Sequence, residues 1–536
     1  MKKILKHSFY VFFILLLFIQ CAKRGTPTGG PEDELPPTFI RATPNNYSTN
    51  FNAEEIRIYF DEYVKLENSQ KQIIISPPMD PAPTITPLGT ASKYIRIQIN
   101  DTLAENTTYV INFGRSIVDN NAANPLPFFK YIFSAGSAID SLSVSGEIKD
   151  AFERIPDSYV SVMLYEVDST YTDSIIYNEV PRYITNTLDS ATTFQLTNLK
   201  AGTYQLIALK DKNNNYKYEP TIDKIGYASE PIEIPTENIF SLELYPETPE
   251  FEITKPAHLA AQHLIFGYKG EIDLKRIEIL QTPVQKNFEY RIFQDQKTDT
   301  LHYFYKPKIT ADSLNFEIIH HNYAEEVSVK LKELEKDSLL LDILPKNEIG
   351  FNDSLIISGN IPLEIQDEKL FNLYDKDSLP VAFTAEMLEY QNKIFIDFEK
   401  SENQVYRFEA LPGAITDFFG SKNDSISHGL KTKEYSDYGN LFFSVQNLPK
   451  HQVILQLVNS KKEVVMQKIG KTLNSFEFLN IKPAKYFLRI IFDTNENGQW
   501  DAGNFLKKIQ PEKVIYFPNE LDIRANWDVS ETFILE

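Results

Sequence analysis

Two short loops carry oxygen-bearing side chains at alternate positions, an arrangement that suits a hard metal ion. In each loop these side chains occupy positions 1, 3, 5 and 9. They are Asp211, Asn213, Asn215 and Glu219 in the first loop, and Asp493, Asn495, Asn497 and Asp501 in the second. Alternate side chains of a tight loop converge on one point, and carboxylate and amide oxygens are ligands that Ca²⁺ prefers. The sequence therefore predicts two structural calcium sites.

The other loop positions decide how closely each loop resembles a full calcium-binding loop. Gly498 occupies the sixth position of the second loop, where an EF-type loop turns sharply, whereas Tyr216 stands there in the first. Neither loop has the bidentate Glu of position 12, because Ile222 and Asn504 stand there. We therefore expect weak binding that stiffens a loop. The alternative is a polar hairpin turn without metal, since Asp and Asn favour turns through local backbone hydrogen bonds.

Motifs that would indicate catalysis are absent from the sequence. It contains no HExxH, no CxxC, no glycine-rich phosphate loop and no nucleophile elbow. His320 and His321 are neighbours at the end of an expected strand, so their rings should point to opposite faces and not share a metal. Asp and Glu are abundant enough that a glycosidase-like carboxylate pair stays open as an alternative. We expect a protein that is not an enzyme.

The only cysteine, Cys21, closes an apolar segment at the start of the chain. The run from Phe9 to Ile19 is shorter than the ~20 residues of a membrane-spanning helix, and it follows the basic residues Lys2, Lys3 and Lys6. Residues 1–20 are therefore predicted to be a signal peptide, and Cys21 the site of a covalent lipid. Gln20 departs from the small residue that a lipoprotein signal requires, so an ordinary signal peptide ending at a free thiol is the alternative.

The residues after Cys21 are predicted to be a lipid-anchored, flexible tether spanning 21–37. They are rich in Gly, Pro and Thr, which favours an extended spacer. More than one acyl chain on Cys21 would be enough for stable membrane attachment.

Composition indicates an exported β protein with several domains. The formal charge of −20 argues against nucleic acid or an anionic membrane surface as partner. The 37 Phe and 29 Tyr supply the bulky side chains that pack sandwich cores. A single cysteine excludes an internal disulfide, so burial must stabilise each domain.

Short segments of alternating polarity, broken by Pro, Asn and Asp, predict an all-β chain of tandem β-sandwich modules. In the first, residues 38–138, Ile56, Ile58 and Phe60 alternate with polar residues, as do Ile95, Ile97 and Ile99. The segment 103–125 then resembles the bacterial Ig-like domain of S-layer and related surface proteins. The matching features are a Leu-x-x-Asn-Thr-x-Tyr turn at Leu103 and an Ile-x-Asp-x-Asn turn at Ile117. This resemblance implies a fold, not a chemistry.

A second type of module is predicted at residues 139–246 and again at 436–536. The first copy resembles the prealbumin-like or carboxypeptidase-regulatory-like sandwich, in which an Asn-Leu-x-x-Gly-x-Tyr turn precedes a long inward-facing strand. Residues 476–501 match residues 194–219 without a gap, each pair being 282 positions apart. Asn198 pairs with Asn480, and Tyr204 with Tyr486. The chain therefore repeats this module, calcium loop included.

The remaining residues predict two further β modules. Residues 346–435 resemble a degenerate second Ig-like domain, because Tyr406 and the Ile415-x-Asp417 turn match Tyr109 and the turn at Ile117. Residues 247–345 form a spacer sandwich with alternating segments at 301–307, 313–319 and 327–334. Only residues 259–264 and 367–374 have the pattern of a short helix.

The signal, the tether and the Ig-like modules together resemble Ig-domain lipoproteins of the Bacteroidota outer membrane. This resemblance implies a non-catalytic, lipid-anchored outer-membrane scaffold that binds a protein partner, for example as an accessory subunit of an assembly or secretion complex. Surface display is favoured over the periplasmic face, although Lys23 and Arg24 stand where acidic residues would direct surface export. The alternative is a glycan-binding or glycan-processing surface lipoprotein, for which Trp500 and Trp527 would form an exposed aromatic platform.

Overall fold

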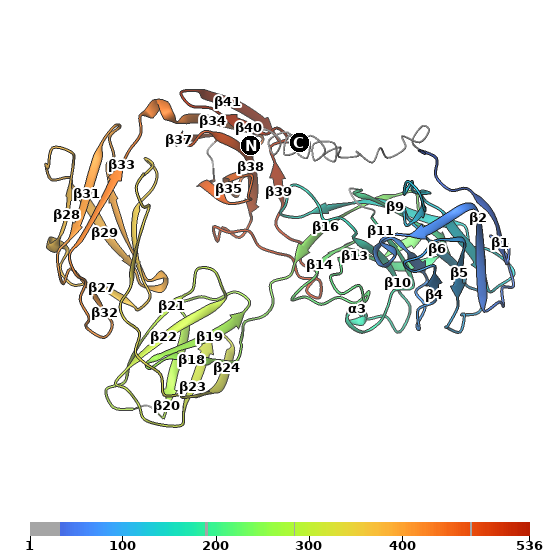
Figure 1. The fold of residues 1–536 in the computed structure, drawn as a ribbon, viewed down its shortest axis with the longest axis horizontal. Helices are drawn as coiled ribbons and strands as arrows, with labels where there is room; N and C mark the ends of the chain where they lie inside the picture. Colours follow the sequence, from blue (N-terminus) through green and yellow to red (C-terminus); the bar gives the residue numbers. More distant parts are fainter. Residues whose placement is uncertain (1–32, 188–190, 284, 472–473, 536) are drawn as a thin grey trace, which may run out of the picture.

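The computed structural model of the chain describes residues 33–187, 191–283, 285–471 and 474–535. The regular structure in these ranges is nearly all β, arranged as tandem sandwiches, which confirms the predicted fold class (Figure 1). No helix within the same ranges is long and apolar enough to cross a membrane. The predicted signal peptide, Cys21 and most of the tether lie outside the described residues.

The described chain forms five consecutive units, numbered 1 to 5, whose strands lie within residues 39–134, 142–246, 252–330, 341–431 and 439–534. Unit 1 is a two-sheet sandwich. One sheet has the order β1-β2-β5-β4 with β7 beside β2, the other has the order β3-β6-β8, and helix α2 (Ser69–Gln72) connects β2 to β3. Ile56, Ile58, Ile95 and Ile97 are fully buried between the sheets, as their alternation predicts. The strands are β1 (Phe39–Thr43), β2 (Glu55–Leu66), β3 (Ile74–Ser76), β4 (Thr84–Thr86), β5 (Ser92–Gln98), β6 (Thr108–Asn112), β7 (Ile117–Asp119) and β8 (Lys130–Ser134).

Unit 2 is a curved sheet that packs on itself around one core, with the order β11-β10-β13-β14-β16-β9-β12 and β15 beside β13. Its first and last strands, β9 and β16, pair in parallel. Helix α3 spans Ile175–Asn178. The strands are β9 (Leu142–Asp150), β10 (Ser161–Glu166), β11 (Tyr183–Asn186), β12 (Thr193–Leu199), β13 (Gly202–Lys210), β14 (Lys224–Tyr227), β15 (Ile232–Ile234) and β16 (Ile239–Pro246).

Unit 5 repeats the strand pairing of unit 2, except that its strands equivalent to β14 and β16 are not paired in the described residues. Its sheets have the orders β37-β34-β41 and β36-β35-β38-β39, with β40 beside β38, and its first and last strands again pair in parallel. The strands are β34 (Gly439–Gln446), β35 (Gln452–Asn459), β36 (Val464–Gly470), β37 (Ser475–Ile481), β38 (Ala484–Asp493), β39 (Val514–Tyr516), β40 (Leu521–Ile523) and β41 (Asp528–Ile534).

The turn that the sequence repeat identifies has the same geometry in both units. The hydroxyl of Tyr204 donates to the carbonyl of Lys200 at 3.3 Å, and that of Tyr486 donates to the carbonyl of Lys482 at 2.7 Å. Asn198 and Asn480 both adopt left-handed backbone conformations, with φ of 61° and 55°. Asn tolerates this region better than most residues, which explains why both copies use it.

Unit 3 contains a sheet of order β17-β19-β22-β21, with β18 beside β19, and a second sheet of order β20-β23-β24. The helix expected at residues 259–264 is wrong. His258 and Ala260 are buried while Leu259 is exposed, which is the alternating burial of a strand. This strand, β18, pairs with β19. The strands are β17 (Glu252–Ile253), β18 (Ala257–Ala260), β19 (His263–Lys269), β20 (Ile277–Thr282), β21 (Glu289–Gln294), β22 (Thr300–Lys306), β23 (Ser313–His320) and β24 (Tyr323–Lys330).

Unit 4 has three small sheets, of orders β25-β26-β30-β29, β28-β31-β33 and β27-β32. The helix expected at residues 367–374 is a single 3₁₀ turn, η1 (Glu368–Leu370), followed directly by strand β28. Another 3₁₀ turn, η2, spans Glu389–Gln391, and η3 (Tyr435–Asp437) leads into unit 5. The strands are β25 (Leu341–Leu344), β26 (Leu355–Gly359), β27 (Leu363–Ile365), β28 (Phe371–Tyr374), β29 (Phe383–Leu388), β30 (Lys393–Phe398), β31 (Val405–Ala410), β32 (Ile415–Asp417) and β33 (Ile426–Lys431).

Units 1 and 4 share the local features on which their predicted likeness rests. The hydroxyl of Tyr109 accepts the backbone N–H of Ala104 at 2.9 Å, and that of Tyr406 accepts the N–H of Ser401 at 2.8 Å, five residues back in both units. Asp119 ends β7 and Asp417 ends β32, and each carboxylate accepts backbone N–H groups of the turn that follows it.

Several pairs of consecutive units are joined by side-chain contacts as well as by the chain. Units 3 and 4 share a small apolar cluster of Phe293, Phe304, Ile361 and Phe418. Units 4 and 5 meet where the side-chain amide of Asn352 donates to the carbonyl of Leu479 at 2.8 Å. Between units 1 and 2, the hydroxyl oxygen of Ser76 accepts the N–H of Ile184 at 3.0 Å.

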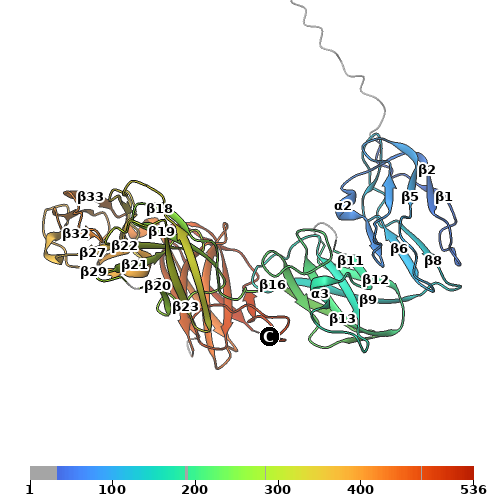
Figure 2. The same ribbon diagram turned by 90° about the horizontal axis from the view of Figure 1, so that it is seen from below.

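A segment of unit 5, residues 502–511, packs against unit 2 and closes the path of the chain (Figures 1 and 2). We call it the latch. Phe505 at its centre is fully buried in a cluster of unit 2 side chains and meets the ring of Tyr227 edge-on at 5.0 Å. The backbone N–H of Phe505 donates to Glu247, and Lys508 forms an ion pair of 2.6 Å with Asp173. Units 2 to 5 therefore form a closed arrangement, with unit 1 attached outside it.

Removing the ring of Phe505 should loosen the latch. Truncating a buried Phe to Ala costs about 3–5 kcal/mol, so the docked segment should open more often in Phe505→Ala. Trypsin cleavage after Lys508 of the mature chain, followed by mass spectrometry, should be faster than in the parent protein. Leu506→Ala is the matched control, because Leu506 is 53% exposed. Equal cleavage rates in the two variants would show that Phe505 does not hold the latch.

Candidate cation-binding loops

The predicted calcium residues lie in two loops that follow equivalent strands. Loop A (residues 211–219) follows β13 of unit 2, and loop B (residues 493–501) begins with the last residue of β38 of unit 5. Each strand is buried at its end, so position 1 of each loop is buried as well. Asp211 is 8% exposed and Asp493 is completely buried.

In loop A, the side chains of positions 3, 5 and 9 come together. The amide of Asn213 donates to both carboxylate oxygens of Glu219, at 3.0 and 2.9 Å, and the amide of Asn215 donates to one of them at 2.7 Å. Oδ2 of Asp211 accepts the N–H of Tyr216 at 2.8 Å. Its other oxygen, Oδ1, is buried and has no hydrogen-bond partner among the described residues.

Loop B converges in the same way, but its first residue is more completely bonded. The amides of Asn495 and Asn497 donate to Asp501 Oδ2 at 2.7 and 2.8 Å. Asp493 accepts N–H groups of Asn497 and Gly498, at 3.1 and 2.9 Å, and the side-chain amide of Gln452 at 2.7 Å. Burial opposes ionisation of Asp493, but these hydrogen bonds hold its pKa below the usual value.

The sixth position has the same backbone conformation in both loops. Gly498 has a φ of 84°, and Tyr216, which replaces glycine in loop A, has a φ of 58°. A tyrosine in this region is strained, because its Cβ crowds the backbone. The sharp turn is therefore present in loop A despite the unfavourable residue, which is compensated by burial of the Tyr216 ring against unit 2.

Each loop also has a carboxylate that the sequence pattern did not identify. Asp223 accepts the N–H groups of Lys212 and Glu219, both at 3.0 Å. Glu512 accepts the equivalent groups of loop B, from Thr494 at 2.6 Å and Asp501 at 3.2 Å. The two acids bond equivalent positions although they lie 4 and 11 residues beyond their loops. The latch separates Glu512 from loop B, which is why a fixed spacing could not find it.

Negative charge accumulates in loop A. Burial raises the pKa of Asp223, and the nearby charges of Asp211 and Glu219 raise it further, while backbone hydrogen bonds oppose the shift. The donor set of carboxylates and side-chain amides fits a Ca²⁺ ion, since rotating an Asn amide by 180° exchanges its nitrogen for its oxygen. Loop A in particular has an unsatisfied carboxylate oxygen that a cation would compensate.

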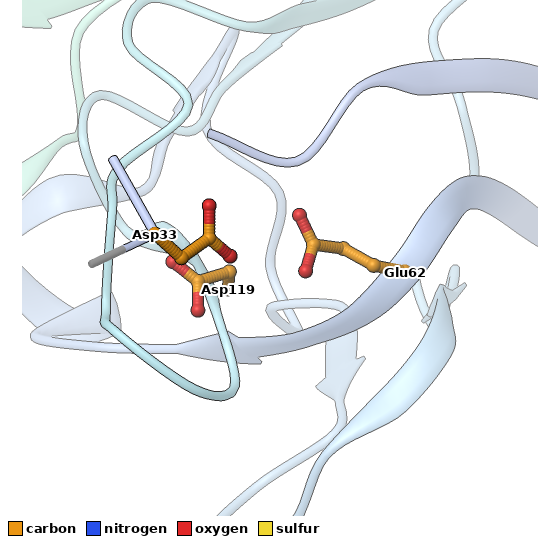
Figure 3. Close-up of side chains that lie close together, drawn as sticks. All are labelled: Asp33, Glu62 and Asp119. Atoms are coloured by element: carbon orange, nitrogen blue, oxygen red, sulfur yellow. The ribbon is translucent and has the colours of Figure 1, made fainter. Parts of the chain in front are cut away.

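A different group of acids lies where the described chain begins. Figure 3 shows Glu62 facing Asp33 and Asp119, and one carboxylate oxygen of each lies within 4.8 Å of the others. Asp119 already accepts the N–H groups of Asn121, Ala122 and Asn124 at 2.6–2.7 Å. Burial raises the pKa of Glu62, as do the charges of Asp119, Asp61 and Asp33. Sequence spacing did not indicate this group, because its members come from three separate segments.

The remaining sequence candidates are dispersed. The expectation that the rings of His320 and His321 point to opposite faces is wrong, because His321 follows the strand in a left-handed turn and the ring centroids lie 4.4 Å apart. The two differ in burial: His320 is 4% exposed and accepts the N–H of Asp273 at 3.0 Å, while His321 is exposed. Trp500 is half-buried, its ring 4.7 Å from that of Phe152 in unit 2, so it offers no open platform for a sugar. Trp527 is 56% exposed.

A chain of histidines and carboxylates in unit 3 was missed by sequence reasoning. Nδ1 of His263 lies 3.0 Å from Asp337, its Nε2 lies 2.8 Å from Nδ1 of His302, and His302 in turn lies 3.5 Å from Asp295. Burial lowers the pKa of His263 to about 4, and the neighbouring His302 contributes, although Asp337 opposes the shift. Burial also lowers the pKa of His302. His263 stacks on Phe304, which contacts unit 4.

Comparison with known proteins gives one family match. Residues 33–134 match the bacterial Ig-like domain, which confirms the resemblance expected for unit 1. No curated protein matches the chain. Similar solved structures include an S-layer protein, rSbsC(31-844), at 10% identity, covering 91% of this chain and 67% of that one with a TM-score of 0.15. The eight N-terminal Ig domains of Down syndrome cell adhesion molecule reach 9% identity, 92% and 70% coverage and a TM-score of 0.15. TM-scores this low carry no functional argument.

Calcium should stabilise the protein through both loops. A ligand at tenfold excess over its Kd adds about 1.4 kcal/mol to the free energy of unfolding, so a chelator should lower the melting temperature of the mature chain. Isothermal calorimetry should count two sites with Kd of about 10⁻⁴–10⁻³ M, the range of extracellular calcium modules. Asp493→Ala should remove one of them. The exposed Asp522→Ala of the same unit is the control. Indifference to chelator would leave both loops as hydrogen-bonded turns.

Acid should destabilise unit 3 through His263. Its pKa falls from 6.5 to about 4 on folding, so between these values the unfolded chain binds a proton that the folded chain does not. The free energy of unfolding should therefore fall as pH decreases through this window, by at most about 3 kcal/mol. Urea unfolding read by pulse proteolysis of unit 3 peptides at pH 7 and pH 5 measures it. His263→Asn should flatten the dependence, and the exposed His321→Asn should not.

Proposed function

We propose that this chain is a non-catalytic scaffold of the bacterial outer membrane, anchored by a lipid on Cys21, that holds a protein partner. The partner would be a component of an outer-membrane assembly or secretion complex, and the cell-surface face is favoured over the periplasmic one. The similarity of residues 33–134 to the bacterial Ig-like domain supports a structural or interaction role. Loops A and B bind structural calcium in this proposal.

The observation that carries the proposal is the docking of the latch. A chain of sandwiches joined only by linkers would be a flexible string, because the units would move independently. Here the latch places Phe505 of unit 5 in the interior of unit 2. Units 3 and 4, which connect units 2 and 5 along the chain, share an apolar cluster with each other. Such a framework presents surfaces from several units in a fixed arrangement, which suits a scaffold better than a spacer.

One edge strand is suited to contact a partner. β36 lies at the edge of its sheet, and Val464, Val465 and Ile469 on it are 43–44% exposed. An unpaired edge with apolar side chains is a ready template for an added strand, and natural proteins usually protect such edges with charge. We therefore propose that a strand of the partner pairs with β36.

The proposal is tested by crosslinking in intact cells, followed by gentle detergent extraction and identification of captured proteins. Cys21→Ser should release the chain from the membrane fraction and abolish incorporation of a fatty-acid label. Val465→Lys should keep the anchor and reduce capture of the partner several-fold, because a charge blocks edge pairing. Asn519→Lys, in an exposed turn of the same unit, is the control for added charge. Recovery of the anchored parent chain as a lone monomer would contradict the scaffold role.

A glycan-binding role has one supporting feature. A cleft of about 1370 Å³ lies where units 3, 4 and 5 approach one another, and Phe251, Tyr268 and Tyr390 contribute to its wall. Binding of the purified chain to a glycan array, lost in Tyr390→Ala, would favour this function over the scaffold.

A further inference from the structure

Loop A lies where three units meet. Its Tyr216 lines an apolar cavity of about 330 Å³ in unit 1, together with Ile73 and Ile75. The backbone N–H of Tyr218, 1% exposed, donates to the carbonyl of Ile176 in unit 2 at 2.9 Å. Both tyrosines belong to, or pack on, the cluster that receives Phe505 of unit 5. The conformation of one nine-residue loop thus sets the position of side chains at two junctions between units.

A continuous set of contacts connects loop A to the latch. Tyr218 and Phe505 belong to one buried cluster. The Tyr218 hydroxyl has no hydrogen-bond partner among the described residues, and burial together with the nearby charge of Glu247 raises the tyrosine pKa. Glu247 is itself 9% exposed and accepts the N–H of Phe505. The carboxylate near Tyr218 is therefore the one that accepts the backbone N–H of Phe505.

One carboxylate oxygen of the same loop has no partner. Oδ1 of Asp211 is buried with no hydrogen-bond partner among the described residues, and the residue is 92% buried. Leaving a charged oxygen buried and unpaired is costly, so the loop should relax toward solvent unless a cation compensates it. Relaxation of loop A would displace Tyr216 and Tyr218, because both belong to the loop, five and seven residues after Asp211, and lie outside any strand. It would also break the hydrogen bond from Tyr218 to Ile176.

We propose that a divalent cation bound to loop A holds the latch in unit 2, so that calcium strengthens the junction between units 2 and 5. This inference rests on the proposed calcium binding by Asp211, Asn213, Asn215 and Glu219. A cation that binds the ordered loop more tightly than the relaxed one shifts the population toward the docked latch. By reciprocity, a docked latch tightens binding of the cation by the same factor.

The test measures trypsin cleavage after Lys508 and calcium affinity on the same full mature chain. Millimolar Ca²⁺ should slow cleavage at least fivefold relative to EGTA. Asp211→Asn should remove this difference, and so should Glu219→Gln, a second variant on a less buried side chain. Asp493→Asn in loop B should leave the loop A effect in place. Phe505→Ala should cleave rapidly with or without calcium and bind calcium at loop A several-fold more weakly.

The outcomes separate the two levels of the proposal. If Asp211→Asn binds as many calcium ions as the parent chain in calorimetry, loop A does not bind calcium. The proposed control of the latch by calcium is then wrong as well. If the loop A site exists but cleavage after Lys508 does not respond to calcium in the parent chain, binding stands and the control of the latch is overturned. Circular dichroism of each variant excludes general unfolding as the cause of faster cleavage.

Discussion

The insertion of Phe505 into unit 2 determines how the rest of the molecule is organised. Without it, units 2 and 5 would contact each other only beside the latch, for example where the Phe152 ring lies 4.7 Å from that of Trp500 and where Glu153 pairs with Lys462. With it, residues separated by 258 positions, Glu247 and Phe505, are hydrogen-bonded. Closing so long a loop by a flexible chain is entropically unfavourable. Here units 3 and 4 are folded and packed against each other, so the closed loop has far fewer degrees of freedom to lose. The entropic cost of forming this contact is therefore that of a much shorter loop, although the two residues are distant in sequence.

The repeat in the sequence explains both what was predictable and what was not. Gap-free matching of residues 194–219 and 476–501 identified equivalent strands, the tyrosine turn and both loops, because these features use side chains at fixed spacing. The latch follows immediately after the matched region, where the two copies diverge, and its partner is another unit. Asp223 and Glu512 escaped for the same reason. These two carboxylates accept hydrogen bonds from equivalent positions, but the number of residues between loop and carboxylate differs between the copies. A search for fixed spacing therefore cannot find them.

Helix propensity predicted the wrong secondary structure where pairing with another strand determines which residues are buried. The segment at 259–264 contains helix-favouring Ala, Leu and Gln, yet pairing of β18 with β19 buries alternate residues and makes it strand. The histidine chain of unit 3 was equally hidden, since His263 and His302 lie on separate strands and only their pairing brings the rings together. Strand alternation fixed which residues face the core, but not which unit would cover them.

The way unit 5 is connected to the rest of the molecule determines how it would transmit force. The chain enters this unit through β34, and β41, the unit's last described strand, lies alongside β34 in parallel over seven residue pairs. Tension applied between the membrane anchor and a partner bound on unit 5 would reach that unit by two routes: through units 3 and 4 in series, and directly from unit 2 across the latch. Two parallel routes divide the force between them. A pull on the anchor would therefore strain the latch together with the linkers, so the docked protein should yield less than a simple string of five sandwiches.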